Sequence, residues 1–365
     1  MCFLGSRVCC RMVAGMAGIA WAASWPAAAA LPTVSDPGQG PVALSSGSTV
    51  AAELSGLAWT GGTSYLAVGD NAADSLWTLG ITLDPATGFI TSGGVTGSIA
   101  APGLGTDSEG IAYRAATGSV FVADEVASSI TQFDAGSGAM LGGVSVPAIY
   151  APANVQSNMG LESLAFGPGG LWTANEEALV PDGPLSTTST GSWVRIQRFG
   201  ETLTPAGQWG YRTDPISALN PFISAERSGV VDILPWSATT LLVLERELGG
   251  GIVPTFRSRL YGVDVAAASD VSALPSIDAG GFTPLAKTLL WEGVFGSSNF
   301  EGMTYGPSLA DGSASLLLIS DNGGGLSQNL YALSVVPEPG AVALILAAAG
   351  LLVPMIRRRS GATSR

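Results

Sequence analysis

The stretch Asn299–Asn322 reads NFEGMTYGPSLADGSASLLLISDN, and it contains the pattern on which the fold depends. Two short apolar segments are joined by Gly, Pro, Ser and Asp residues, and the second segment ends on Asp321-Asn322. Short apolar segments bounded by such turn residues are typical of β-strands. The stretch therefore predicts a β-hairpin whose first strand opens at Glu301-Gly302.

The same pattern occurs four more times upstream. The copies read SGLAWTGGTSYLAVGD from Ser55, EGIAYRAATGSVFVADE from Glu109, LESLAFGPGGLWTANEE from Leu161 and, more loosely, GVVDILPWSATTLLVLERE from Gly229. Segments that fit a third and a fourth strand follow these four hairpins. Four strands in a period of about 50 residues are the sequence signature of a β-propeller blade. We therefore predict an all-β chain, folded as a β-propeller of five to six four-stranded blades.

The blade number stays open because the repeats do not account for every segment. A sixth blade would lie in the long spacing between the fourth and fifth copies, or would combine residues 31–52 with the C-terminal strand. Pro41–Leu44 and Thr49–Ala52 are the candidate edge strands there. An N-terminal strand that completes the last blade would close the ring and remove its exposed edges. Within the third repeat, the Pro-, Gly-, Ser- and Thr-rich segment Val180–Ser192 predicts a surface loop.

Residues 1–30 have the features of a signal peptide. Arg7 and Arg11 precede the apolar segment Met12–Ala23, and the small residues Ala27–Ala30 follow it. We expect cleavage by signal peptidase near Ala28–Ala30; the alternative is an N-terminal membrane anchor. All three cysteines lie in this segment, so the processed chain would have neither disulfides nor thiol chemistry.

Residues 336–359 form a second targeting segment. Val336–Gly340 reads VPEPG, the apolar segment Ala341–Ile356 follows, and Arg357–Arg359 ends it. The apolar segment is shorter than the ~20 residues of a typical membrane-spanning helix, but arginine side chains can reach the interface. The order of these parts resembles the PEP-CTERM sorting signal of Gram-negative bacteria. The resemblance implies a transmembrane sorting helix, processing by an exosortase, and a membrane-anchored precursor that ends at the cell surface or in the extracellular matrix. An ordinary C-terminal anchor is the alternative.

The region between these segments, residues 31–335, is strongly acidic. The whole chain has a net charge of −13, yet six of its 15 Lys and Arg residues lie in the two ends, with only one of its 28 Asp and Glu residues. An acidic surface repels phosphate backbones, so nucleic acid is not an expected partner. Contact with the membrane is expected only through the C-terminal sorting helix.

The five repeats, taken in order over Glu53–Ser334, resemble the phytase-like family, which is also described as esterase-like activity of phytase. The resemblance rests on SGLAW…GD, SEGIAY…ADE, GLESLAF…ANEE, GVVDIL…LERE and NFEGMTY…SDN. It implies that residues 31–335 form a phytase-like β-propeller. It also implies hydrolysis of a phosphate ester or another ester.

The residue types restrict the available chemistry. The chain contains no histidine, which excludes Ser-His-Asp and Cys-His nucleophile systems and zinc bound by histidine. Carboxylates, hydroxyls, arginines and metals held by oxygen remain.

The carboxylates recur at fixed places in the repeats. Glu109, Glu162 and Glu301 share one position, and equivalent positions of successive blades surround the propeller axis. We expect these three glutamates, with Arg246 as a clamp for an anionic substrate, to be catalytic. A second set follows the second strand of each hairpin and is expected to bind a metal: Asp70, Asp124, Glu125, Glu176, Glu245 and Asp321. Oxygen ligands of this kind suit Ca²⁺.

Several functional hypotheses are compatible with this sequence. The first is an exported Ca²⁺-dependent hydrolase of phosphate or other anionic esters. The second is a non-catalytic propeller that binds exopolysaccharide or a protein partner at the cell surface, and the third is a structural surface protein whose metal stiffens loops. The repeated acidic residues have their own alternative, because such residues also cap turns and pack blades together.

Overall fold

The computed structural model describes residues 31–45, 51, 53–70, 74–217, 227–249, 255–323 and 326–336. The predicted signal peptide and nearly all of the predicted sorting signal lie outside these residues, as does most of the candidate strand Thr49–Ala52. Within the described part of the chain, no helix is long and apolar enough to cross a bilayer.

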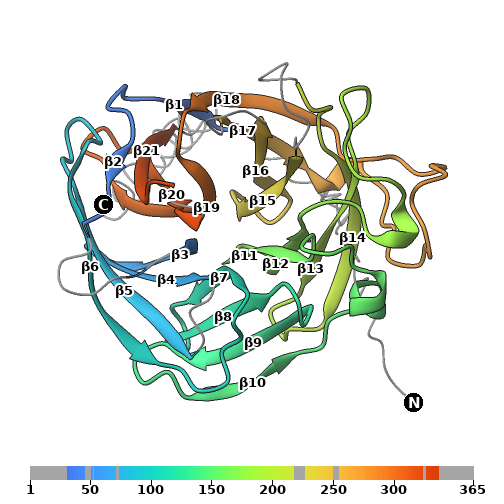
Figure 1. Cartoon of the computed structure of the whole chain (residues 1–365), viewed down its shortest axis with the longest axis horizontal. Coiled ribbons are helices and arrows are strands. Elements are labelled where there is room, and N and C mark those ends of the chain that lie inside the picture. Colours follow the sequence, from blue (N-terminus) through green and yellow to red (C-terminus); the bar gives the residue numbers. More distant parts are fainter. Residues whose placement is uncertain are drawn as a thin grey trace, which may run out of the picture.

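Five antiparallel sheets surround a central axis (Figure 1). The first two sheets contain, from the axis outward, β3 (Leu54–Gly61), β4 (Ser64–Gly69), β5 (Ser75–Leu83) and β6 (Ile90–Ala100), then β7 (Ser108–Arg114), β8 (Ser119–Asp124), β9 (Ser129–Asp134) and β10 (Met140–Val144). The next two contain β11 (Leu161–Gly167), β12 (Gly170–Asn175), β13 (Trp193–Phe199) and β14 (Pro205–Arg212), then β15 (Arg227–Pro235), β16 (Thr240–Gly249), β17 (Thr255–Asp264) and β18 (Lys287–Phe295). Short 3-10 helices lie in the connections, at Ala148–Tyr150, Pro152–Asn154, Val180–Asp182 and Val265–Ala267.

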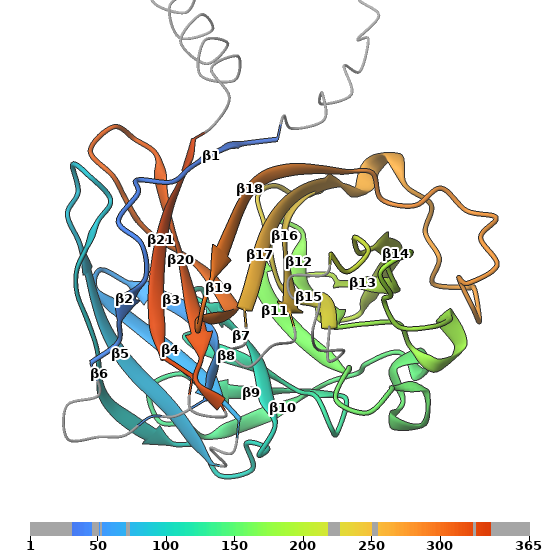
Figure 2. The same cartoon turned by 45° about the horizontal axis from the view of Figure 1, so that its top comes forward.

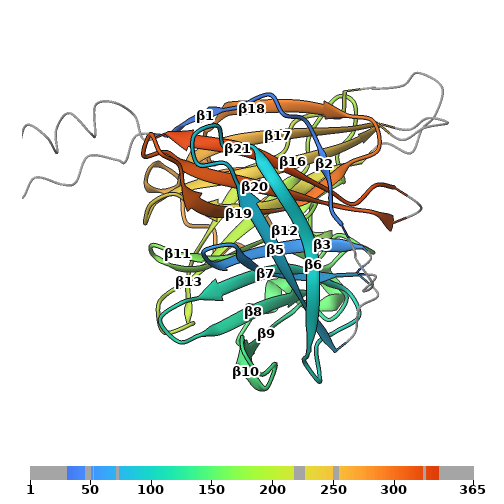
Figure 3. The ribbon, with the colours of Figure 1, turned by 90° about the vertical axis from the view of Figure 1, so that its left-hand side faces the viewer.

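The fifth sheet joins the two ends of the described chain. It contains β19 (Asn299–Ser308), β20 (Ala314–Asp321) and β21 (Asn329–Val336), and the N-terminal β1 (Thr33–Ser35) and β2 (Val42–Ala43) both pair with β21 (Figures 2 and 3). The predicted closure of the ring by an N-terminal strand is therefore confirmed. The described residues form five blades. This number lies within the predicted range of five to six, and among the described residues the long spacing before the last repeat is filled by extended strands and a connecting loop of blade four.

Each blade packs on the next through its own apolar cluster. One cluster fills each interface between neighbouring sheets, and the interface of blades four and five contains Leu244, Leu260, Phe300 and Leu318. The inner strands β3, β7, β11, β15 and β19 contact one another in sequence around the axis. Side chains on an inner strand therefore meet side chains from other blades.

The insertion in the third repeat is exposed at residues 187–189, as predicted for a surface loop, but it is anchored inward at Asp182. Asp182 is fully buried, and its carboxylate forms two bonds with the guanidinium of Arg195, at 2.6 and 2.8 Å. Arg195 also donates to the backbone oxygens of Val271 and Leu274. The loop folds inward because this bidentate ion pair ties it to blade three and to a second loop.

The fourth repeat contains a buried carboxylate that links three inner strands. Asp232 is 6% exposed and accepts hydrogen bonds from the backbone N–H groups of Ile233 and, in blade five, Met303. Burial raises its pKa well above the usual range, against the opposing effect of hydrogen bonds from Met303, Ile233 and Leu164 of blade three.

We predict that Asp232→Ala lowers the free energy of unfolding by about 2–4 kcal/mol, because backbone donors in the neighbouring strands lose their buried acceptor. Asp232→Asn retains an acceptor oxygen and should cost less. Urea unfolding followed by tryptophan fluorescence measures both. Equal stability of wild type and Asp232→Ala would show that the inner strands do not depend on this side chain.

Candidate functional site

Every inner strand is bulged at the same place. The pairing of the inner strand with its neighbour shifts at Ser55, Glu109, Glu162, Val231 and Glu301. A β-bulge changes the direction in which a side chain points. The three repeated glutamates therefore occupy the bulge of blades two, three and five, while blades one and four have serine and valine there.

Glycine after the bulge lets neighbouring inner strands approach closely. A Cβ atom on Gly302 would lie 2.2 Å from the carbonyl oxygen of Ser55 in blade one, and one on Gly56 would lie 2.3 Å from that of Glu109 in blade two. No side chain fits at these distances. In a Glu-Gly pair, the glutamate occupies the bulge and the glycine lets the neighbouring inner strand come close. The glutamates of different blades are therefore brought together around the axis.

A cavity of about 450 Å³ lies among these bulges. Six carboxylate residues line it together with two arginines and other side chains: Asp70, Glu109, Asn158, Glu162, Glu176, Arg227, Arg246, Leu248, Phe256, Asn299, Glu301, Asp321, Gly323 and Leu326. The cavity therefore contains all four residues expected to be catalytic and three of the six expected to bind metal.

Arg246 of β16 neutralises one side of the cavity. Its Nη2 atom lies 3.0 Å from Oε1 of Glu176 in blade three and 2.9 Å from Oε1 of Glu301 in blade five. Burial raises the pKa of Glu301 to about 7, although the positive charge of Arg246 opposes the rise. One guanidinium from blade four thus serves the carboxylates of both neighbouring blades.

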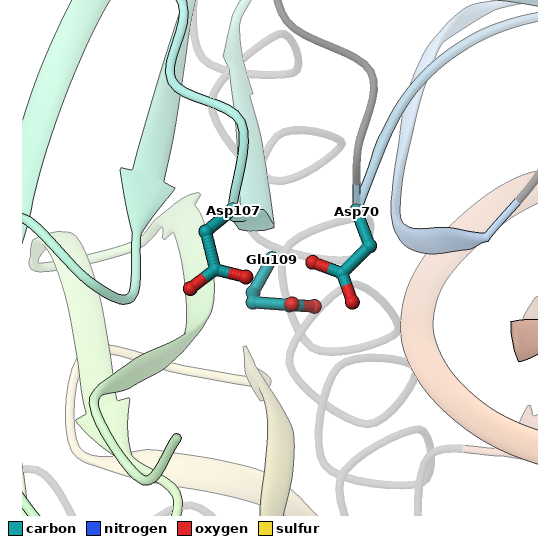
Figure 4. Close-up of side chains that lie close together, drawn as sticks. All are labelled: Asp70, Asp107 and Glu109. Atoms are coloured by element: carbon teal, nitrogen blue, oxygen red, sulfur yellow. The ribbon is translucent and has the colours of Figure 1, made fainter. Parts of the chain in front are cut away.

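Five carboxylates from three blades cluster at the other side of the cavity, and three of them, Asp70, Glu109 and Glu162, line it. In two groups of three, the ligand oxygens lie within 4.8 Å of one another: Asp70, Asp107 and Glu109 (Figure 4), and Glu109, Glu125 and Glu162. None of the five forms an ion pair with a lysine or arginine of the described chain. Close, desolvated like charges are stable only with protons or cations among them.

The pKa values of these carboxylates reflect that repulsion. Burial, followed by the charges of neighbouring carboxylates, raises the pKa of Glu109 and Glu162 well above the usual range. Burial raises the pKa of Glu125 to about 8, and burial together with Asp70 raises the pKa of Asp107 to about 6. At neutral pH, full ionisation of the group requires a compensating cation.

Two residues expected to bind metal lie elsewhere. Asp124 accepts a hydrogen bond from the backbone of Ala127 and lines a separate cavity of about 200 Å³. Glu245 is buried between blades three and four, where it contacts Lys287 at 2.6 Å and the hydroxyl of Tyr211 at 2.5 Å. Because side chains alternate along a strand, Glu245 cannot share the direction of its neighbour Arg246.

The sequence interpretation missed Asp107 and Asn299. Each precedes its repeated glutamate by two residues, and Glu53 has the same relation to Ser55. In blade two the carbonyl oxygen of Asp107 accepts a hydrogen bond from the backbone N–H of Glu125, and the same bond joins Glu53 to Asp70 in blade one. A comparison of repeats at this position could have identified both residues.

Together, the fold and the cavity define a five-bladed β-propeller with an acidic site on its axis. The chain belongs to the phytase-like family: the family model described as esterase-like activity of phytase matches residues 49–324. No curated protein is significantly similar to the chain in sequence.

Several solved structures are similar in shape at low sequence identity. The PQQ-bound aldose sugar dehydrogenase of Streptomyces coelicolor has 14% identity and a TM-score of 0.41, over 85% of this chain and 100% of the other. A luciferin-regenerating enzyme has 11% identity and a TM-score of 0.37, over 84% of this chain and 96% of the other. The WD40 domain of Toxoplasma gondii coronin has 11% identity and a TM-score of 0.36, over 85% of this chain and 89% of the other.

We predict that Arg246→Gln lowers the free energy of unfolding at pH 8 by about 3–5 kcal/mol, because it leaves buried carboxylates without their cation. Without Arg246 the pKa of Glu301 rises further. A carboxyl group with a raised folded-state pKa loses its stabilising contribution as the pH rises through that value. The loss should therefore be smaller at pH 5, where Glu301 is protonated.

Urea unfolding at both pH values, with EDTA present, tests this expectation. Arg114→Gln is the matched control, because Arg114 forms an ion pair with the exposed Glu201 at 3.4 Å, and such surface pairs contribute about 0–1 kcal/mol. The same loss for Arg246→Gln at pH 5 and pH 8 would contradict the role assigned to Glu301.

Proposed function

We propose that the chain is an exported, calcium-dependent hydrolase of phosphate or other anionic esters. The observation that carries the proposal is the distribution of charge in one cavity. Carboxylates without ion-pair partners occupy one side, and a buried guanidinium occupies the other. A divalent cation and an anionic substrate would together satisfy both sides.

Arg246 has the geometry of an anion-binding residue. Its Nη2 atom is held by Glu176 and Glu301, while its Nε atom is buried and has no hydrogen-bond partner among the described residues. A buried donor without a partner is costly, and a phosphate or carboxylate oxygen would satisfy it. Arg227, which is exposed and lines the same cavity, offers a second positive charge.

The carboxylate side fits a hard divalent cation. Its donors are all oxygens, and they come from three blades. Calcium accepts such flexible oxygen ligands. When bound, a divalent cation offsets the charge of an anionic ester and makes water more acidic.

Glu301 is suited to accept a proton from the attacking water. Arg246 and Asn299 both donate to its Oε1 atom, at 2.9 and 2.7 Å, which fixes the side chain and leaves Oε2 for proton transfer. Its pKa of about 7 is close to the value that favours general base catalysis at neutral pH.

We predict that the purified chain hydrolyses p-nitrophenyl phosphate or bis(p-nitrophenyl) phosphate, and that EDTA abolishes and added Ca²⁺ restores the activity. Glu301→Gln should lower kcat by about 10²–10⁴-fold, which is the usual contribution of general acid–base catalysis. Arg246→Lys retains the charge but not the planar guanidinium, so it should mainly raise KM.

Glu201→Gln is the control for the loss of one carboxylate, because Glu201 is largely exposed. Folding of each variant is checked by circular dichroism. Full activity of a folded Glu301→Gln variant would exclude Glu301 as the base, and the absence of hydrolysis for every ester tested would favour a binding function.

One observation favours the second function, binding of exopolysaccharide. Further along the inner strands, a smaller cavity of about 160 Å³ is lined by half-buried aromatic residues at equivalent positions of four blades: Trp59, Tyr113, Phe166 and Tyr305. Aromatic faces of this kind can pack against sugar rings. Loss of polysaccharide retardation in affinity electrophoresis for Trp59→Ala, with unchanged retardation for Glu301→Gln, would support this function over hydrolysis.

The proposal of export rests on the sequences of the two predicted targeting segments. Thr33 and Val336 are paired residues of β1 and β21, so both segments join the propeller at one place. We predict that the protein recovered from the cell surface or the extracellular matrix begins near Leu31 and ends near the Pro-Glu-Pro motif, as determined by mass spectrometry. Recovery of the uncleaved chain from the cytoplasm would contradict export and exosortase processing.

A further inference from the structure

We infer that the cavity selects esters in which a single phosphate group is joined to an apolar alcohol. The phosphate would lie at Arg246, and the alcohol group would lie against an apolar wall formed by Leu248, Phe256 and Leu326. This inference rests on the proposed function and deepens it, because it names the substrate class of the same site. Hydrolysis of such an ester releases the alcohol and inorganic phosphate, with water supplying the new hydroxyl group on phosphorus and the proton on the alcohol.

Blade four places apolar side chains beside the buried guanidinium. Leu248 of β16 is paired with Arg227 of β15 and with Phe256 of β17. Directly paired residues of antiparallel strands lie on one face of a sheet, and so do residues two positions apart on one strand. Arg246, two residues before Leu248, therefore faces the same side as this row, and all four residues line the cavity. An ester whose phosphate contacts Arg246 thus has Leu248 and Phe256 within reach of its alcohol group.

A third apolar side chain comes from blade five. Leu326 lies in the connection between β20 and β21 and lines the same cavity. Leu248 and Leu326 are both partly exposed, so a ligand in the cavity can contact them. Among the described lining residues, all three apolar side chains come from blades four and five, and the rest of the lining is mostly charged or amide side chains. A ligand that brings apolar surface against this wall is favoured, because both surfaces are then removed from water.

The charges of the cavity limit the ligand to one phosphate group. The described lining contains six carboxylate residues and two arginines. The Nη2 atom of Arg246 donates to Glu176 and Glu301, which leaves its buried Nε atom as a donor without a partner among the described residues. A second phosphate on the alcohol group would lie against the apolar wall, where burial of an unpaired charge is costly. Polyanionic esters such as inositol hexakisphosphate are therefore expected to be poor substrates.

The experiment compares alkyl phosphates that differ only in chain length. Ethyl phosphate and n-hexyl phosphate have the same reacting group and leaving groups of similar acidity, so a difference in kcat/KM reports contact with the alkyl chain. Release of inorganic phosphate is measured with the full chain in the presence of Ca²⁺. We expect kcat/KM for n-hexyl phosphate to exceed that for ethyl phosphate by about 10-fold or more, since one methylene group in an apolar pocket changes kcat/KM by about 10–200-fold. Inositol hexakisphosphate should release little phosphate.

Polar substitutions in the apolar wall should remove this preference. Leu248→Asn and Leu326→Asn should each lower the ratio of the hexyl to the ethyl kcat/KM toward one, because the apolar contact is lost while the charge of the cavity is unchanged. Leu326 lies outside the strands, so its variant tests the expectation if Leu248→Asn does not fold. Leu289→Asn is the matched control and should retain the wild-type ratio, because Leu289 is 50% exposed on β18 and is not among the described residues that line the cavity.

Binding of phosphonates separates this inference from the proposed function. Ethylphosphonate and n-hexylphosphonate have a P–C bond in place of the ester bond, so isothermal titration calorimetry measures their Kd whether or not the chain is a hydrolase. Tighter binding of n-hexylphosphonate that is lost in both wall variants, without hydrolysis of any ester, upholds the ligand class and counts against the hydrolase.

Three other outcomes overturn the inference and leave the hydrolase intact. They are hydrolysis with equal kcat/KM for the two alkyl esters, a wild-type ratio in both wall variants, and efficient hydrolysis of inositol hexakisphosphate. The absence of both phosphonate binding and ester hydrolysis overturns the inference and the proposed function together.

Discussion

The close approach of the five inner strands is the constraint on which the rest of the structure depends. Strands this close to one axis have no room for ordinary side chains at every position, so glycine follows the bulge at Gly56 and Gly302. The bulge directs the side chain of the residue before this glycine, such as Glu301, toward the other blades. Packing of the backbone and assembly of the acidic cavity are therefore consequences of the same local arrangement, which explains why glutamate and glycine occur together in the repeats.

The sequence of blade four fits the repeat least well. Its residues offset part of the negative charge that the glutamates of the other blades bring to the axis. It has Val231 in place of a bulge glutamate, and its next strand supplies Arg246 to the carboxylates on either side. It has Asp232 in place of the following glycine, and that carboxylate binds backbone donors of the neighbouring strand. The departures from the repeat thus have two effects. Arg246 supplies positive charge between carboxylates that would otherwise repel one another, and Asp232 supplies an acceptor for a backbone N–H group. Compensation is incomplete on the side of blades one to three, where burial and neighbouring carboxylates raise the pKa values of Glu109 and Glu162.

The two cavities along the inner strands are lined by different kinds of residue, because the side chains of these strands change from acidic to apolar and aromatic along their length. The bulged segment carries carboxylates, and the residues beyond it are apolar and aromatic, as in Leu57–Trp59 and Met303–Tyr305. Carboxylates and arginines line the first cavity, whereas the described lining of the second contains neither. β1 and β2 complete the outer side of blade five by pairing with β21, so the edge of that strand is covered and the N-terminal segment is tied to the last blade.

The sequence by itself determined the class of fold, the four-stranded repeat and the equivalence of Glu109, Glu162 and Glu301, because turn residues and apolar segments recur at regular spacing. Only the tertiary structure decided the blade number, since β1 pairs with a strand some 300 residues away in the sequence. It also decided which carboxylates meet. Asp107 joins the cluster and Glu245 does not, because neighbouring positions on a strand face opposite sides and the bulge changes the register. Position in a repeat predicts which residues are equivalent, whereas packing between blades determines which side chains share a cavity.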